Sequence, residues 1–227
     1  MAATVAYAAA QAKTRAVLFD LDGTFADTAP DMARALNHVR ALNGLPNLPQ
    51  ADIRPYVSGG ARGMLGVGFG IVPEDPRFDV LRQAFLDFYE QNVCIESVVF
   101  PGMMQLVVEL ERRAIRWGIV TNKAARFTLP LVRLLKVDQR AACIVCGDSV
   151  TRAKPHPDSL LHAMTLLGIP PHAGLYVGDD ERDIQAASAA GMRSLAVQYG
   201  YLGVTSHPKD WGADGVIDTP GDVLRYL

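Results

Sequence analysis

The chain has 227 residues, with 22 Lys and Arg against 24 Asp and Glu and a formal net charge of −2. Hydrophobic residues make up 49% and charged residues 20%, which is ordinary for a globular protein with one large domain or a core and a smaller insert. No basic stretch offers an electrostatic footprint for nucleic acid and no apolar run is long enough to span a bilayer, so we expect neither partner.

The first 14 residues are predicted to form a disordered tail. Their Ala-rich start carries no positive charge ahead of its apolar part, which is not the pattern of a secretory signal peptide. Of the three cysteines, Cys94, Cys143 and Cys146, the last two spell C-x-x-C within a predicted strand, where positions i and i+3 face opposite sides. We therefore expect buried reduced thiols rather than a metal or redox site, and a cytoplasmic protein.

The first chemical motif follows the first predicted strand. An apolar run over residues 16–19 predicts a buried parallel strand, and Asp20-Leu21-Asp22-Gly23-Thr24 comes directly after it. Both aspartates then lie at the carboxyl end of the strand, where open α/β sheets place their active sites. Such a pair suits an aspartate nucleophile with an acid/base partner, although solvated turns also contain acidic pairs.

Residues 28–100 show helical patterns and no convincing strand. One helix is predicted from Pro30 to about Asn43, and another over residues 78–92, where apolar residues recur at helical spacing. We expect a helical insert between a turn at Ala26-Asp27 and a return at Phe100-Pro101-Gly102. The insert divides an α/β core made of residues 15–27 and 101–227.

Strands and helices alternate through the rest of the chain. Strands are predicted over residues 115–121, 142–146, 174–177, 194–197 and 215–217. Helices are predicted over residues 124–136, 157–167 and 181–190, with a last helical turn or two at 222–227. This alternation implies a parallel sheet with helices on both faces, so the predicted fold class is α/β.

Three further polar motifs follow predicted core strands. Thr121-Asn122-Lys123 offers a hydroxyl and backbone N–H groups to a phosphate oxygen, or only caps the next helix. Lys154-Pro155 is by itself typical of a surface turn. The four acids of Gly178-Asp179-Asp180-Glu181-Arg182-Asp183 suit either a helix start, which favours negative charge, or a hard metal cation.

Together, the order D-x-D-G-T, T-N-K, K-P and G-D-x-x-x-D resembles the haloacid dehalogenase-like hydrolase superfamily, in particular its phosphoglycolate phosphatase-type branch. The resemblance covers the chain from about Arg15 onward, with all four motifs intact. It implies a Rossmann-like core with a small helical cap domain, residues 28–100, inserted after the first strand. It also implies an Mg²⁺-dependent hydrolysis of small phosphate monoesters by a monomer or homodimer.

The resemblance also implies roles for individual residues. Asp20 would be the nucleophile and Asp22 the acid/base group, while Lys154 would offset charge on Asp20 and on the phosphate. The implied phosphate-binding residues are Gly23, Thr24, Thr121, Asn122 and Lys154. The implied metal site comprises Asp20, the backbone carbonyl of Asp22, Asp179, Asp180 and Asp183. Asp183 would act mainly behind the direct ligands, and Asp180 would reach the metal directly or through water. The alternative is that Asp180 and Asp183 are simple helix-start acids. Two like charges 4 Å apart repel by about 4 kcal/mol at an effective dielectric near 20, so such a cluster needs a cation.

The predicted specificity residues lie in Ser58-Gly59-Gly60-Ala61-Arg62-Gly63 of the insert. Gly59 and Gly60 allow close approach of the backbone to a substrate, and Arg62 either pairs with a substrate carboxylate or is solvated. Phe25 departs from the family, which usually has a smaller aliphatic residue after D-G-T, and is expected to narrow the site entrance.

The resemblance leaves the substrate open. Asp148 and residues 154–161 look like phosphoglycolate phosphatases. Residues 57–62, 178–183, 199–201 and 211–214 look like the N-acetylmuramic acid 6-phosphate phosphatases of cell-wall recycling. A phosphomutase is a less favoured alternative. A dehalogenase would not use Asp22 or a metal, and an inactive binding module would typically have lost Asp20, Asp22 or Lys154.

Overall fold

The computed structural model describes residues 13–204 and 207–227, so nearly all of the predicted tail lies outside the described residues. Its main sheet has six parallel strands in the order β5-β4-β1-β6-β7-β8. The strands span Ala16–Phe19 (β1), Arg116–Val120 (β4), Ile144–Val145 (β5), Gly174–Gly178 (β6), Arg193–Val197 (β7) and Gly215–Ile217 (β8). This confirms the predicted α/β class with a parallel sheet.

The central strand β1 is buried on both faces. It pairs with β4 on one side and β6 on the other, and all four of its residues are fully buried. Val17 and Phe19 join one hydrophobic cluster, while Ala16 and Leu18 join another, because successive side chains of a strand point to opposite faces. The residue after β1 is thereby fixed in the middle of the sheet's carboxyl edge.

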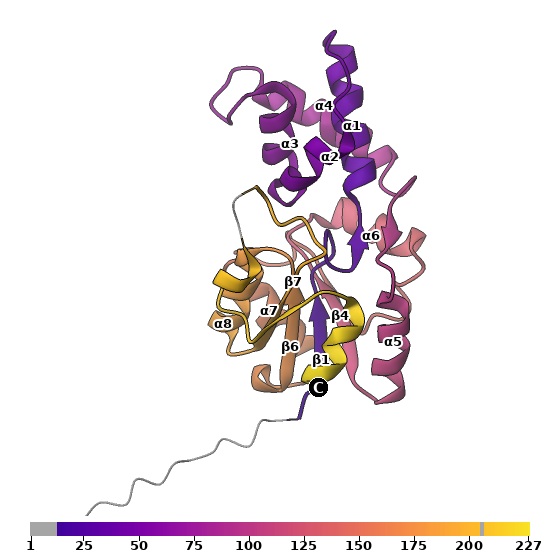
Figure 1. Cartoon of the computed structure of the whole chain (residues 1–227), viewed down its shortest axis with the longest axis vertical. Coiled ribbons are helices and arrows are strands. Elements are labelled where there is room, and N and C mark those ends of the chain that lie inside the picture. The colour runs from indigo at the N-terminus through magenta and orange to yellow at the C-terminus, as the bar shows by residue number, and fades with distance from the viewer. Residues whose placement is uncertain (1–12, 205–206) are drawn as a thin grey trace, which may run out of the picture.

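Four helices cover the two faces of this sheet (Figure 1). Helices α5 (Met103–Arg112) and α6 (Ala125–Leu134) contribute to the cluster containing Val17, and α7 (Asp158–Leu167) and α8 (Glu181–Ala190) to the cluster containing Leu18. Short 3₁₀ segments span Pro171–Ala173 (η2), Pro208–Asp210 (η3) and Pro220–Tyr226 (η4). None of the helices in the described ranges has the length and apolar character that crossing a bilayer requires.

The helical insert lies beyond the carboxyl edge of the sheet (Figure 1). Its helices are α1 (Ala29–Leu42), α2 (Gln50–Ile53), α3 (Gly60–Phe69) and α4 (Phe78–Gln91), with the 3₁₀ segment η1 (Arg54–Gly59) before α3. A Cβ atom at Gly68 would overlap the side chain of Leu36, so glycine is what lets α3 approach α1 this closely. Two short strands, β2 (Ala26–Asp27) and β3 (Val98–Val99), pair antiparallel where the chain enters and leaves the insert.

Several predicted elements need correction. The expected turn at Ala26-Asp27 is strand β2, and its partner β3 lies in a segment predicted to have no strand, because two-residue strands are too short to show periodicity. Helix α5 was not predicted, the strand expected over 142–146 is only β5, and the last turns are the 3₁₀ segment η4 rather than residues 222–227. The cysteines flanking β5 are buried and unpaired, as expected.

The prediction for Phe25 is also wrong. Its side chain is fully buried and its ring stacks on Trp117, with centroids 5.5 Å apart. Phe25 is therefore a core residue and does not narrow the entrance of the site.

Candidate active site

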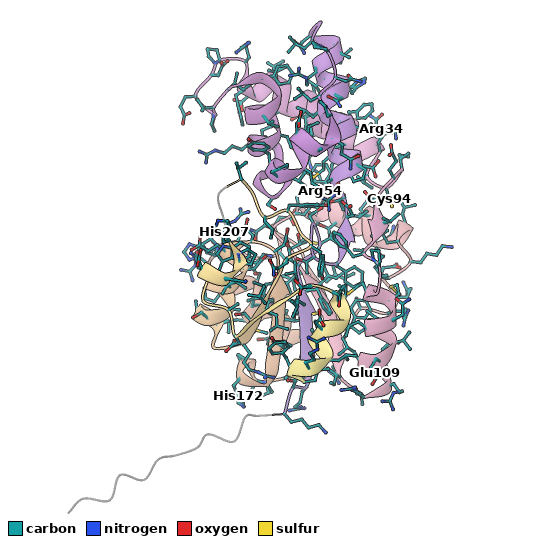
Figure 2. All side chains as sticks on the ribbon, in the orientation of Figure 1. Arg34, Arg54, Cys94, Glu109, His172 and His207 are labelled. Carbon is teal, nitrogen blue, oxygen red and sulfur yellow. The ribbon has the colours of Figure 1, made fainter. Side chains whose placement is uncertain are left out.

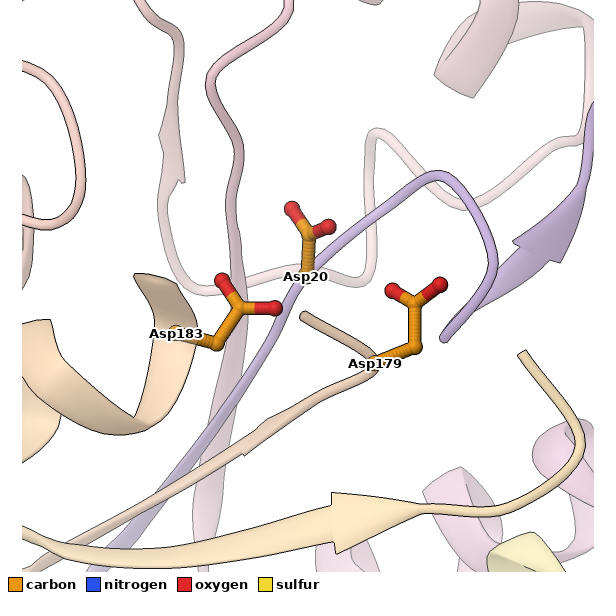
Figure 3. Close-up of side chains that lie close together, drawn as sticks. All are labelled: Asp20, Asp179 and Asp183. Carbon is orange, nitrogen blue, oxygen red and sulfur yellow. The ribbon is translucent and has the colours of Figure 1, made fainter. Parts of the chain in front are cut away.

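Three aspartates gather at the carboxyl edge of the sheet. Asp20 follows β1, Asp179 follows the neighbouring strand β6, and Asp183 lies in the first turn of α8. Each has a carboxylate oxygen within 4.8 Å of the others, and Figure 3 shows the three carboxylates grouped around a common space. The parallel arrangement of β1 and β6 brings the first and last sequence motifs together.

Lys154 supplies positive charge at the base of this cluster. Its Nζ lies 2.9 Å from Asp20 Oδ1 and 2.6 Å from Asp183 Oδ1, and it donates to Tyr176 Oη at 2.7 Å. Burial opposes the charged form, but Asp183 and Asp20 outweigh it and raise the pKa of Lys154 above its usual value. Lys154 therefore remains a cation.

One lysine does not balance three carboxylates. Burial is the largest cause that raises the pKa of Asp20 to about 7, with repulsion from Asp183 adding to it and Lys154 opposing it. Burial and the charges of Asp20 and Asp183 raise the pKa of Asp179 well above its ordinary value. Three carboxylates with only one lysine beside them suit a hard divalent cation such as Mg²⁺, which prefers oxygen ligands and supplies the missing positive charge.

Asp179 is held in place by several neighbours. Thr24 Oγ1 donates to its Oδ1 at 3.0 Å, and the backbone N–H of Tyr201 donates to its Oδ2 at 2.8 Å. Gly23 has φ of +83°, and a Cβ atom there would overlap the carboxylate of Asp179. The structure thus places Gly23 and Thr24, both predicted to bind phosphate, against a predicted metal ligand.

Thr121 and Asn122 have different roles beside the aspartate cluster. The side chain of Asn122 spans the backbone of Lys154, accepting from its N–H at 3.0 Å and donating to its carbonyl at 2.9 Å. Thr121 Oγ1 accepts from the N–H of Lys123 at 3.1 Å, which leaves the hydroxyl proton available to a ligand. Both side chains line the cavity in front of the cluster, with Asn122 also fixing the loop that carries Lys154.

Asp22 does not bring its side chain into the three-aspartate cluster. Its Oδ1 accepts from Thr28 Oγ1 at 2.5 Å and from Lys123 Nζ at 2.8 Å. Lys123 also lies over the ring of Tyr89 on α4, 4.7 Å from the centroid. Two donors on one oxygen fix the carboxyl group, and its other oxygen has no hydrogen bond within the described part of the chain.

Asp180 likewise stays outside the cluster as the N-cap of α8. Its carboxylate accepts from the backbone N–H of Arg182 and forms a two-pronged ion pair with the guanidinium, with N–O distances of 2.7 Å. Burial works against the charged form of Asp180, but Arg182 outweighs it and lowers the pKa. This arrangement favours the interpretation of Asp180 as a helix-start acid.

A cavity of about 280 Å³ lies between the cluster and the helical insert. From the insert it is lined by Met32, Val57, Ser58, Gly59 and Gly60, and from the core by Asp20, Asp22, Thr121, Asn122, Lys123, Lys154, Asp180, Arg182 and Asp183. Arg62 lines neighbouring hollows instead, one of them a space of about 450 Å³ shared with Gly59 and Arg182. The structure therefore brings the predicted glycines to the cavity and leaves Arg62 outside it.

Direct contacts tie the insert to the core next to this cavity. Arg54 pairs with Asp27 through two contacts of 2.9 and 2.8 Å, and Figure 2 shows Arg54 where the insert meets the core. Tyr201 Oη donates to Asp27 at 2.7 Å and accepts from the backbone N–H groups of Thr28 and Ala29 at 2.6 and 2.9 Å. Tyr201 therefore links the entry to the insert with Asp179, to which its own N–H donates.

Sequence reasoning assigned no role to Lys123, Arg182 or Tyr201. Lys123 and Arg182 stand within motifs already singled out, and Tyr201 within residues 199–201, which were noted only for their resemblance to one group of phosphatases. Tyr201 lies 22 residues beyond Asp179 and 174 beyond Asp27, and only the folded chain brings these groups together.

Comparison with known proteins gives a consistent picture. A family model described as haloacid dehalogenase-like hydrolase matches residues 17–197. An N-acetylmuramic acid 6-phosphate phosphatase of Pseudomonas aeruginosa is 41% identical over 215 residues, covering 95% of each chain. A phosphoglycolate phosphatase of Xanthomonas campestris pv. campestris is 41% identical over 206 residues, covering 91% of this chain and 93% of the relative.

Solved structures share the fold. A protein from Haemophilus somnus 129pt, described as a predicted phosphoglycolate phosphatase, superposes with a TM-score of 0.83 at 24% identity, covering 94% of this chain and 97% of that one. A HAD-superfamily hydrolase of Geobacter sulfurreducens gives a TM-score of 0.75 at 22% identity, covering 94% and 96%. At these identities the likeness concerns the fold alone.

Proposed function

The chain belongs to the haloacid dehalogenase-like hydrolase family, and from that premise we propose that it is an Mg²⁺-dependent phosphomonoesterase working through an aspartyl-phosphate on Asp20. The family and the phosphatase class agree with the prediction from sequence. The observation that carries the mechanism is the convergence of Asp20, Lys154 and the acids of the last motif beside a cavity. We further propose that residues 28–100 act as a cap domain over a core of residues 15–27 and 101–227.

In the proposed first step, a carboxylate oxygen of Asp20 attacks phosphorus while the bond from phosphorus to the ester oxygen breaks. Asp22 gives its proton to that oxygen, so the product leaves as an alcohol. Asp22 then takes a proton from water, whose oxygen attacks phosphorus and frees the carboxylate of Asp20 with release of inorganic phosphate. Thr121 would donate to a phosphoryl oxygen, and Lys154 would hold the nucleophile.

The residues present fit a bound Mg²⁺. Asp20, Asp179 and Asp183 would hold it together with the backbone carbonyl of Asp22, while Asp180 remains paired with Arg182. When bound, the ion would neutralise charge on the carboxylates and on the phosphoryl group. Thr24 and Tyr201 would orient Asp179 toward it.

For the substrate we propose a small phosphate ester that carries a carboxylate, as 2-phosphoglycolate does. The cavity of about 280 Å³ lies at the small end of ligand pockets and suits such a compound. N-acetylmuramic acid 6-phosphate is the second candidate, because the adjoining hollow of about 450 Å³ offers room for a sugar and a relative covering 95% of the chain bears that activity in its name. A cytoplasmic location and a monomeric or homodimeric state stay predictions.

The test is phosphate release with and without Mg²⁺ from both candidate substrates and from p-nitrophenyl phosphate. We expect Mg²⁺-dependent turnover that chelation abolishes, and a higher kcat/KM for 2-phosphoglycolate. A large preference for N-acetylmuramic acid 6-phosphate would move the enzyme to cell-wall recycling. Absence of phosphate release from all three would contradict the proposed function.

In the same assay, Asp20→Asn should lower kcat at least about 1,000-fold while the fold is kept, because an amide is a far poorer nucleophile than a carboxylate. Circular dichroism of the variant provides the control for folding. Appreciable turnover by a folded Asp20→Asn protein would remove Asp20 as the nucleophile.

A further inference from the structure

Three basic side chains line the cavity, and they differ in how far they are already engaged. Lys154 contacts two carboxylates and the hydroxyl of Tyr176, and Lys123 is bound to Asp22 and largely buried. Arg182 differs, because its side chain is 42% exposed and its Nη1 makes no hydrogen bond or ion pair within the part of the chain that the structure describes. It is the basic group best able to meet a second charged group on a substrate.

Arg182 is nevertheless held in one orientation. Its Nε and Nη2 form the two-pronged pair with Asp180, and Nη2 also donates to the carbonyl of Ser58 at 2.8 Å. The hydrogen bond with Asp180 is the main cause that raises the pKa of the guanidinium. A planar guanidinium fixed along one edge presents its remaining N–H groups in a defined direction, which lowers the entropy lost when a ligand binds.

The same contact joins Arg182 to the turn of the insert that faces the cluster. Ser58, whose carbonyl accepts from Arg182, precedes Gly59 and Gly60, and all three residues line the cavity with Arg182. Asp20 lines the same cavity, so this group can contact the leaving group of a phosphate held at Asp20. Arg62 lies outside that cavity.

We propose that Arg182, with the turn Ser58–Gly60, forms the leaving-group subsite, and that its Nη1 binds the carboxylate of the substrate. This inference rests on the proposed function and assigns substrate recognition to an arginine of the core in place of Arg62. A guanidinium–carboxylate contact is charge-assisted, so it discriminates strongly between esters with and without a carboxylate.

The test compares matched substrates in the Arg182→Met variant. One pair is 2-phosphoglycolate and its amide 2-phosphoglycolamide, which keeps the phosphate but lacks the carboxylate. The other is N-acetylmuramic acid 6-phosphate and N-acetylglucosamine 6-phosphate, which lacks the lactyl carboxylate. We expect kcat/KM for the carboxylated member of the wild type's preferred pair to fall about 10- to 100-fold relative to its counterpart, mainly through KM, because a hydrogen bond to a charged group is lost. Arg182→Lys should show a smaller loss of kcat/KM than Arg182→Met, since lysine keeps the positive charge but lacks the planar guanidinium.

The chain offers a closely matched control. Arg77 pairs with Asp75 through its backbone N–H, Nε and Nη2, as Arg182 does with Asp180, but it lies in the insert away from the cavity. Arg77→Met should leave the ratio between matched substrates unchanged. An equal loss on both members in Arg182→Met, or a selective loss in Arg62→Met instead, would overturn the proposal.

Turnover of p-nitrophenyl phosphate distinguishes a failure of this proposal from a failure of the proposed phosphomonoesterase function. If the wild type hydrolyses that ester with Mg²⁺, the proposed function holds, and the ratios between matched substrates decide the role of Arg182. If the wild type hydrolyses none of the esters, the proposed function fails first and the subsite proposal fails with it.

Discussion

At the scale of single residues, the site depends on polar side chains that hold the proposed catalytic and metal-binding residues in position. Thr24 donates to Asp179, Asn122 spans the backbone of Lys154, and Thr28 donates to Asp22. The sequence motifs predicted which acids and which lysine would gather. They did not separate the residues that meet a ligand from those that orient them, because that distinction depends on where each short polar side chain points.

Thr24 offers a direct test of such a supporting role. Thr24→Val keeps the shape of the side chain but removes the hydroxyl that donates to Asp179, so Mg²⁺ affinity should fall about 10- to 100-fold. The measurement is the Mg²⁺ concentration at half-maximal activity, supported by calorimetric titration of the metal. Thr24→Ser, which keeps the hydroxyl, should bind Mg²⁺ nearly as the wild type does. Unchanged affinity in Thr24→Val would show that Thr24 does not orient a metal ligand.

At the scale of elements, most segments with a clear local pattern were predicted, although helix α5 was not, and strands β2 and β3 were not predicted either. The strand over residues 16–19, the helix over 181–190 and the strand over 215–217 coincide with β1, α8 and β8. Strands β2 and β3 have two residues each and exist because they pair with one another, which no local pattern records. The contacts of Tyr201 with Asp27 and with α1 are long-range in the same way.

The link between Tyr201 and the start of the insert is open to a specific test. Tyr201→Phe removes a hydroxyl that serves two buried backbone N–H groups and Asp27, so the free energy of unfolding should fall by about 1–3 kcal/mol. KM should rise more than kcat falls, because the insert would be held less firmly beside the cavity. The checks are urea denaturation and steady-state kinetics.

Tyr199→Phe is the matched control for that experiment. Within the described residues its hydroxyl makes one hydrogen bond, to the carbonyl of Thr24 at 3.2 Å, so a smaller loss of stability and little change in KM are expected. Equal effects in the two variants would argue against a special role of Tyr201 at the junction.

At the scale of the whole molecule, folding brings the first and the last sequence motifs together at the aspartate cluster. Folding buries Asp20 and Asp179 and raises the pKa of both, so the metal-free folded state favours their protonated forms. For Asp20 this contribution to stability is full below the ordinary pKa of 3.8 and is lost as the pH rises through about 7. A divalent cation binds the carboxylate forms and reverses that trend.

We therefore expect Mg²⁺ to raise the melting temperature more at pH 8 than at pH 5.5. Thermal unfolding with and without the metal, at constant ionic strength adjusted with NaCl, measures the difference. Calorimetry in two buffers of different ionisation enthalpy should also show proton release on Mg²⁺ binding near pH 6.5. A metal-induced shift that is equal at both pH values, without proton release, would be inconsistent with Mg²⁺ binding at these carboxylates.

The most direct measurement of the central claim is to trap phosphate on Asp20. In Asp22→Asn the proposed acid/base group is gone, so water attack should be slow, while p-nitrophenolate can still leave without a proton from the enzyme. The variant is reacted with Mg²⁺ and p-nitrophenyl phosphate labelled in its phosphoryl group, and the reaction is then quenched with acid. The quenched protein should carry label that hydroxylamine releases, and Asp20→Asn should carry none. Labelling that persists in Asp20→Asn, or Mg²⁺-dependent hydrolysis by Asp20→Asn at the wild-type rate, would contradict an aspartyl-phosphate at Asp20.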